Sequence, residues 1–151
     1  MSADEFEKVF FRLDVNEDGY PPVGIESLNA KKLSDGTFQL DNTPFFVEGI
    51  ALGDIVSADL IPDSDERYWF DEVLAQSDNQ SLSIILIDNN SSDEVALKLK
   101  ALGCYCEYGE FGNLKMLAVS VLSGCNYNEI FEYLEKLEDA ETLSFAELAI
   151  G

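Results

Sequence analysis

The chain has 151 residues, of which 30 are acidic, 9 are basic and none is histidine, so its formal net charge is −21. The lack of histidine excludes Ser-His-Asp and Cys-His catalysis and removes the commonest transition-metal ligand. A hydrophobic content of 46% predicts a folded protein despite the charge, and the excess of carboxylates disfavours nucleic acid and anionic membranes as partners.

The N-terminal half predicts a small β unit. Apolar and polar residues alternate over residues 7–15, and the segment 34–37 has the composition of a hairpin turn. Further strands are expected over residues 23–33, 38–40, 55–60 and 68–75. Short strands separated by turns at this spacing are typical of a small barrel or a strongly curved sheet. The polar segment Gln76–Ser81 predicts the boundary, with a barrel-like unit in residues 1–80 and a second unit in residues 81–151.

The second unit is organised around Ser83–Asp88, an apolar run that predicts a strand buried on both faces. Ser91 and Glu94 have capping-box spacing before one predicted helix, and Asn126 is the expected cap of another. Strands are expected over residues 104–108, 114–122 and 143–145. The element order β-α-β-β-α-β predicts an α+β fold, with a small N-terminal β-barrel-like unit followed by a ferredoxin-like βαββαβ unit.

The densest acidic cluster surrounds a short aromatic run and is the predicted partner-binding site. It consists of Asp63, Asp65, Glu66, Tyr68, Trp69, Asp71 and Glu72. Aromatic side chains can anchor a partner while the carboxylates provide rate and selectivity. A solvated acidic loop is the alternative interpretation. The predicted second helix carries another acidic face, at Glu132, Glu135, Glu138 and Asp139, which is more simply explained as a polar helix surface.

Two other groups of residues have the spacing of metal or redox sites. Asp14, Asn16, Asp18 and Gly19 match the start of a calcium loop, but Ile25 stands where the final glutamate belongs, which favours a structural turn. Cys104, Cys106 and Cys125 lack a fourth zinc ligand and are expected to be buried thiols. No cofactor or nucleotide motif occurs. The acidic N-terminus and the odd cysteine number favour a cytoplasmic protein.

Several segments together resemble a known group of proteins. They include Phe11–Val23, Leu40–Phe46, Gly49–Asp54 and Ala101–Cys104. The chain resembles a family of short, acidic bacterial proteins classed only as a domain of unknown function. The resemblance covers nearly the whole chain and is most specific in the first 54 residues, and it carries over no catalytic residue. Some proteins of this type are encoded beside polymorphic toxins, which would make them immunity proteins.

Three functions follow as hypotheses. The first is a non-enzymatic immunity protein that covers the active site of a cognate toxin, with a basic or nucleotide-using toxin such as a nuclease or an ADP-ribosyltransferase as the expected partner. The second is a regulatory or small-ligand-sensing module. The third and least favoured is an enzyme that uses paired carboxylates, because the sequence does not show two acidic residues meeting in a pocket.

Overall fold

The computed structural model describes residues 6–88 and 92–150, which form a closed five-stranded barrel and a four-stranded sheet with two helices. The barrel consists of β1 (Glu7–Arg12), β2 (Ile25–Lys32), β3 (Phe38–Leu40), β4 (Ile55–Leu60) and β5 (Arg67–Ala75). Successive strands are antiparallel, and a parallel pairing between β1 and β5 closes the barrel. The barrel predicted from the alternating pattern is confirmed.

The interior of the barrel is filled by alternate side chains of its strands. Val9, Leu28 and Val56 point inward and are fully or almost fully buried. The hairpin turn between β2 and β3 lies where it was predicted, and Gly36 adopts a φ of +87° that suits glycine. β1 ends at Arg12, earlier than predicted, and Val15 is 49% exposed. The chain turns around Asn16 soon after the end of β1, and this turn carries Val15 away from the core.

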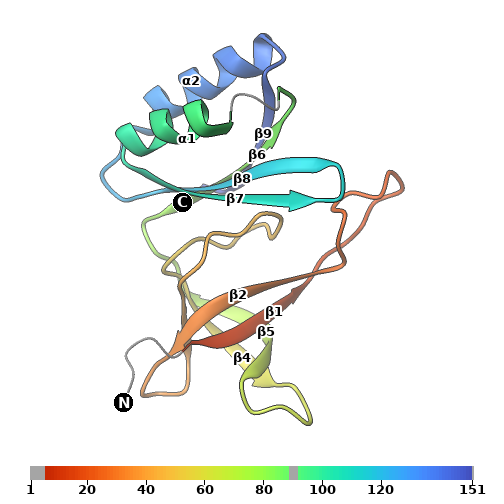
Figure 1. The fold of residues 1–151 in the computed structure, drawn as a ribbon. Helices are drawn as coiled ribbons and strands as arrows, with labels where there is room; N and C mark the ends of the chain where they lie inside the picture. The colour runs from red at the N-terminus through yellow and green to blue at the C-terminus, as the bar shows by residue number, and fades with distance from the viewer. Residues whose placement is uncertain (1–5, 89–91, 151) are drawn as a thin grey trace.

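The second sheet is built from β6 (Gln80–Leu86), α1 (Ser92–Ala101), β7 (Cys104–Phe111), β8 (Leu114–Val121), α2 (Tyr127–Asp139) and β9 (Leu143–Ala149). Its strand order is β7-β8-β6-β9, and every neighbouring pair is antiparallel. Both helices cover one face of the sheet, and the barrel lies beneath the other face (Figure 1). The fold is therefore mixed α/β, with a barrel and a helix-covered antiparallel sheet.

Most of the apolar run that was predicted to be a buried strand lies in the central strand β6. Leu82 and Ile84 are buried against the helices, and Ser83 is buried on the opposite face. Ile87, which was also expected to be buried, is 58% exposed because the strand ends at Leu86. The predicted cap of α2 is confirmed, since Asn126 Oδ1 accepts a hydrogen bond from the Glu129 N–H at 3.2 Å. Ser91, the other predicted cap, lies outside the described residues.

A loop between β3 and β4 joins the barrel to the sheet. This segment, residues 41–54, lies between the two (Figure 1) and is called the joint loop below. The hydroxyls of Thr43 and Ser120 are 2.7 Å apart, and both residues are buried. The Gly49 N–H donates to the Leu148 carbonyl at 2.8 Å, which ties the same loop to β9. Direct hydrogen bonds therefore connect the two parts of the chain.

Candidate functional site

The predicted partner-binding residues lie on the β4–β5 hairpin, which projects from the barrel on the side away from the sheet (Figure 1). Asp63, Asp65 and Glu66 lie in its turn, whereas Asp71 and Glu72 lie on β5, and all of them are exposed. We call these five residues the acidic hairpin surface. The structure thus places all five predicted carboxylates in solvent on one hairpin.

A β-bulge explains why two neighbouring carboxylates of β5 are both exposed. Adjacent residues of a strand normally point to opposite faces. In the β4–β5 pairing, Ser57 lies opposite Glu72 and Ala58 lies opposite Phe70, so Asp71 is an additional residue. Its carboxylate accepts a hydrogen bond from Ser57 Oγ at 3.2 Å. The bulge leaves Asp71 and Glu72 together on the outside of the barrel.

The two predicted aromatic anchors point in opposite directions. Tyr68 is only 8% exposed, and its ring packs 4.6 Å from that of Phe38 inside the barrel. It is therefore not available to a partner, contrary to its predicted role. Trp69 is half-buried on the outer face. The pairing of β1 with β5 in the barrel determines which of the two rings faces inward.

Two residues that were not selected from the sequence contact Trp69. The Phe10 ring meets it edge-on at a centroid distance of 6.1 Å. The guanidinium carbon of Arg12 lies 4.1 Å from the Trp69 ring centroid, a cation–π geometry. The alternation of β1 could have identified Phe10 and Arg12 from the sequence, because Val9 and Phe11 point inward and their neighbours must therefore point outward. Phe10, Arg12 and Trp69 form an aromatic and cationic patch on the barrel.

The acidic face of α2 is divided in the structure. Glu132, Glu135 and Asp139 are exposed. Glu138 is exposed as well, but its Oε2 atom also accepts a hydrogen bond from the Phe145 N–H of β9 at 3.1 Å. Glu138 therefore has a structural role at the border of the sheet.

The calcium-like segment forms a turn in which Asn16 bonds the backbone. Its Oδ1 atom accepts hydrogen bonds from the N–H groups of Asp18, at 2.9 Å, and Tyr20, at 3.0 Å. This is the local hydrogen bonding that favours Asn in turns. Asp14 and Asp18 are exposed. Within residues 6–88 and 92–150, no three His, Cys, Asp or Glu side chains are grouped so that they could hold a metal ion.

The three cysteines are free thiols beside the core of the second sheet. Cys104 is buried, and Cys106 and Cys125 are half-buried against the same core. Burial raises the pKa of Cys104 to about 12 and that of Cys106 to about 11. A raised pKa lowers the thiolate fraction near neutral pH, and the thiolate is the reactive form. These two thiols are consequently packing residues.

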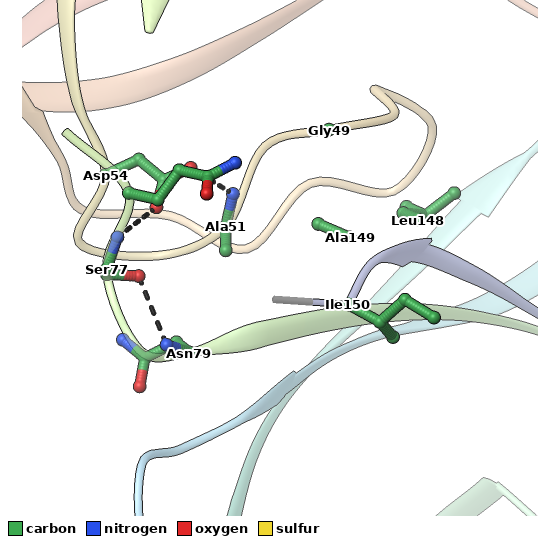
Figure 2. Close-up of a pocket in the computed structure, with 9 residues that line it drawn as sticks. Gly49, Ala51, Asp54, Ser77, Asn79, Leu148, Ala149 and Ile150 are labelled. Carbon is green, nitrogen blue, oxygen red and sulfur yellow. Dashed lines mark hydrogen bonds between the residues drawn. The ribbon is translucent and has the colours of Figure 1, made fainter. Parts of the chain in front are cut away.

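Beside the joint loop, a small cavity of about 240 Å³ is lined by both parts of the chain. Figure 2 shows Ala51, Asp54 and Ser77 on one side and Leu148 and its neighbours on the other. Asp54 is 2% exposed, and its carboxylate accepts the Ala51 N–H at 3.0 Å and the Ser77 N–H at 2.8 Å. Because both carboxylate oxygens bond the backbone, Asp54 holds the joint loop against the segment that leads into β6.

A second carboxylate holds the opposite end of the joint loop. Glu26, on β2, accepts N–H groups from Phe45 at 2.6 Å, Phe46 at 3.1 Å and Val47 at 3.0 Å. Burial raises the pKa of Glu26, and the three hydrogen bonds act in the opposite direction. The Phe45 and Phe46 rings in turn pack against Phe111 at the end of β7, with centroid distances of 5.1 and 4.9 Å. The role of Glu26 could not be predicted from the sequence because its hydrogen-bond partners are distant along the chain.

A groove of about 500 Å³ lies near the joint loop, between the barrel and β9. Phe11, Phe46 and Phe70 contribute aromatic surface, and Arg12 and Glu48 contribute charge. None of these residues was predicted to form a site.

Among the described residues, no helix is long and apolar enough to cross a bilayer.

Comparison with known proteins places the chain in a family. A search of curated proteins finds no match. The chain is similar to a solved structure described as a "Novel crystal structure of a hypothetical protein from Neisseria gonorrhoeae", with a TM-score of 0.79 and 20% sequence identity over 97% of this chain and 96% of the other. At that identity, the likeness shows the fold alone. Residues 26–145 match the family model of a domain of unknown function, DUF4265. The chain therefore belongs to the DUF4265 family.

Proposed function

We propose that the protein is a non-enzymatic binding protein that holds a basic partner on its acidic hairpin surface. The observation that carries the proposal is the exposure of five carboxylates on one hairpin, beside the patch formed by Phe10, Arg12 and Trp69. A net charge of −21 attracts a cationic protein over a distance, and a half-buried aromatic ring supplies apolar contact area. Carboxylates at the rim of such an interface act chiefly on the association rate.

In the cell, we propose that the partner is a bacterial toxin domain and that the chain acts as its immunity protein in the cytoplasm. The high acidity suits a toxin with a basic active cleft, such as a nuclease, or one that binds a nucleotide. The three free cysteines suit a reducing compartment. The toxin's active site would be covered by the hairpin, so no catalytic residue is required of the immunity protein.

Co-expression with the product of the adjacent gene tests this function. The hairpin variant Asp63→Asn, Asp65→Asn, Glu66→Gln removes three charges, and the asparagine introduced at position 63 tolerates the left-handed backbone found there. The matched control Glu132→Gln, Glu135→Gln, Asp139→Asn removes three exposed charges from α2.

We expect the hairpin variant alone to bind the partner at least about tenfold more weakly, mainly through slower association. Equal losses in both variants would show that only net charge matters. A neighbouring gene product that neither binds the chain nor harms cells would contradict the immunity role.

The groove between the barrel and β9 favours a second candidate function, that of a regulatory or small-ligand-sensing module. Its volume of about 500 Å³ is within the usual range for small-molecule sites. We also propose that the sheet and its helices are ferredoxin-like, which the order β7-β8-β6-β9 with antiparallel neighbours supports. A thermal-shift screen with amino acids and nucleotides tests the ligand-sensing function. A hit that Phe46→Ala or Phe70→Ala abolishes would support it, and the absence of any shift would count against it.

A further inference from the structure

The second sheet has two border strands, and they differ in whether other groups bond to their outer side. β7 and β9 are its outermost strands, so each pairs on one side only (Figure 1). The other side of an outermost strand presents backbone N–H and carbonyl groups that can pair with another chain, and proteins normally protect such a border. The two borders can therefore be compared within one sheet.

Strand β9 is protected. Its Phe145 N–H, which points away from β6, donates to the Glu138 carboxylate at 3.1 Å. The Leu148 carbonyl accepts the Gly49 N–H of the joint loop at 2.8 Å. The Tyr127 hydroxyl of α2 donates to the Glu147 carboxylate and fixes the helix beside this strand. Side-chain and loop groups thus occupy positions that an added strand would need.

Strand β7 is unprotected. In the described part of the chain, its backbone is hydrogen-bonded to β8 and to no other segment. The strand runs for eight residues and contains no lysine or proline, the residues that commonly block such a border. The two-residue turn Gly112–Asn113 makes Phe111 and Leu114 a hydrogen-bonded pair. Bonding to β8 then alternates along the strand, so Cys106, Tyr108 and Glu110 direct their N–H groups outward.

Each face of β7 carries one tyrosine and one glutamate, and Glu107 also accepts hydrogen bonds from the Tyr105 hydroxyl at 3.1 Å and from Asn42 Nδ2 of the joint loop at 3.5 Å. Tyr105 and Glu107 share the barrel side, and Tyr108 and Glu110 share the helix side, because side chains alternate. Tyr105 and Tyr108 are 46% and 49% exposed. Two cations lie nearby: Lys115 is opposite Glu110 on β8, and Lys100 interacts with Cys106. Asp41 adds negative charge beside Tyr105. The border is amphipathic and on balance acidic.

These charges distinguish between possible occupants. Pairing of β7 with β7 of a second copy would bring Glu107 and Glu110 against glutamates and join two chains of net charge −21 each. A strand from a basic protein would instead place lysine or arginine opposite these glutamates. Main-chain hydrogen bonds would supply affinity, and alternate side chains would supply selectivity.

We propose that β7 is a docking edge that accepts an extended segment of a basic partner protein as an additional strand of the sheet, with alternating apolar and cationic side chains. The inference rests on β7 alone. It is independent of the acidic hairpin surface, which lies at the far side of the barrel (Figure 1).

The probe is a blocked octapeptide of alternating valine and lysine, followed by amide chemical shifts and hydrogen exchange in the full chain. A comparison peptide of alternating proline and lysine has the same charge but lacks half of the N–H donors. We expect shifts at Cys106, Tyr108 and Glu110 with the valine peptide, and slower exchange of their amides by at least about fivefold. The proline peptide should affect these amides at least about fivefold less.

Two variants separate backbone pairing from charge. Tyr108→Pro removes an outward N–H without touching the bonds to β8, and Tyr108→Ala is its control because it retains that N–H. Glu107→Lys with Glu110→Lys keeps every N–H and reverses both charges, so the test remains decisive if the proline variant does not fold. We expect Tyr108→Pro and the double reversal to lose the response at β7, and Tyr108→Ala to retain most of it.

Three results would overturn the proposal. One is a response confined to the hairpin or scattered over the surface. Another is equal binding of the two peptides, which would show attraction by charge only. The third is a dimer of the free chain, seen in sedimentation, that Tyr108→Pro dissociates, because a second copy would then be the occupant.

Discussion

The buried carboxylate of Asp54 offers the sharpest test of how the barrel is attached to the sheet. One of its oxygens accepts the Ala51 N–H and the other accepts the Ser77 N–H. A hydrogen bond to a charged group contributes about 1.5–3 kcal/mol. Asp54→Asn keeps the size of the side chain but replaces one acceptor oxygen by an amide that cannot accept. We expect it to lower the free energy of unfolding by about 1.5–3 kcal/mol.

Asp54→Ala removes both bonds and should cost about 3–5 kcal/mol, because Asp54 is only 2% exposed and water cannot readily replace the carboxylate. Urea denaturation measures the loss. For a chain of this size, each kcal/mol also shifts the melting temperature by about 2–4 °C. The control is Asp78→Asn, an exposed aspartate of the same segment, for which we expect a change within about 0.5 kcal/mol. A small effect of Asp54→Asn, or an equal effect of Asp78→Asn, would refute the reasoning.

Three further predictions concern the second sheet. Burial raises the pKa of Cys104 from 9.0 to about 12 and that of Cys106 from 9.0 to about 11. The stability that these buried thiols contribute is therefore complete below the unfolded value of 9.0 and is lost as the pH rises toward the folded values. In denaturation under reducing conditions, the free energy of unfolding should fall by about 2–3 kcal/mol between pH 8 and 10. The fall should be smaller in the variant with alanine at both positions, and identical pH profiles of the two proteins would contradict the prediction. Glu138→Ala should cost about 1–2 kcal/mol and increase aggregation measured by light scattering, whereas Glu135→Ala should do neither. Phe111→Ala should cost about 2–3 kcal/mol in urea denaturation, since its ring bridges the two parts of the chain.

Local patterns revealed the elements well. Alternation predicted the barrel strands, and Asn126 marked the start of α2, because these signals lie within a few neighbouring residues. Alternation also states that Tyr68 and Trp69 lie on opposite faces. It does not say which one faces inward, because the pairing of β5 with β1 decides that. The bulge at Asp71 is equally invisible, since it depends on the register against β4.

The connection between the two parts could not be predicted, because its contacts join distant segments. Thr43 meets Ser120, which is 77 residues away, and Glu26 binds backbone groups about 20 residues further along the chain. Asp54 resembles an ordinary turn residue in the sequence, yet it is buried. The five carboxylates of the hairpin were found because they are close in sequence, whereas Phe10 and Arg12 reach the same area from another strand.

The protection of β9 sets an upper limit on self-association. A filament that grows strand by strand needs two receptive borders on every subunit, so that each addition leaves a new one exposed. Here one border is occupied by Glu138 and Gly49. Edge-to-edge joining of native copies would accordingly terminate at a pair, even in a crowded or high-salt solution that screens their mutual repulsion.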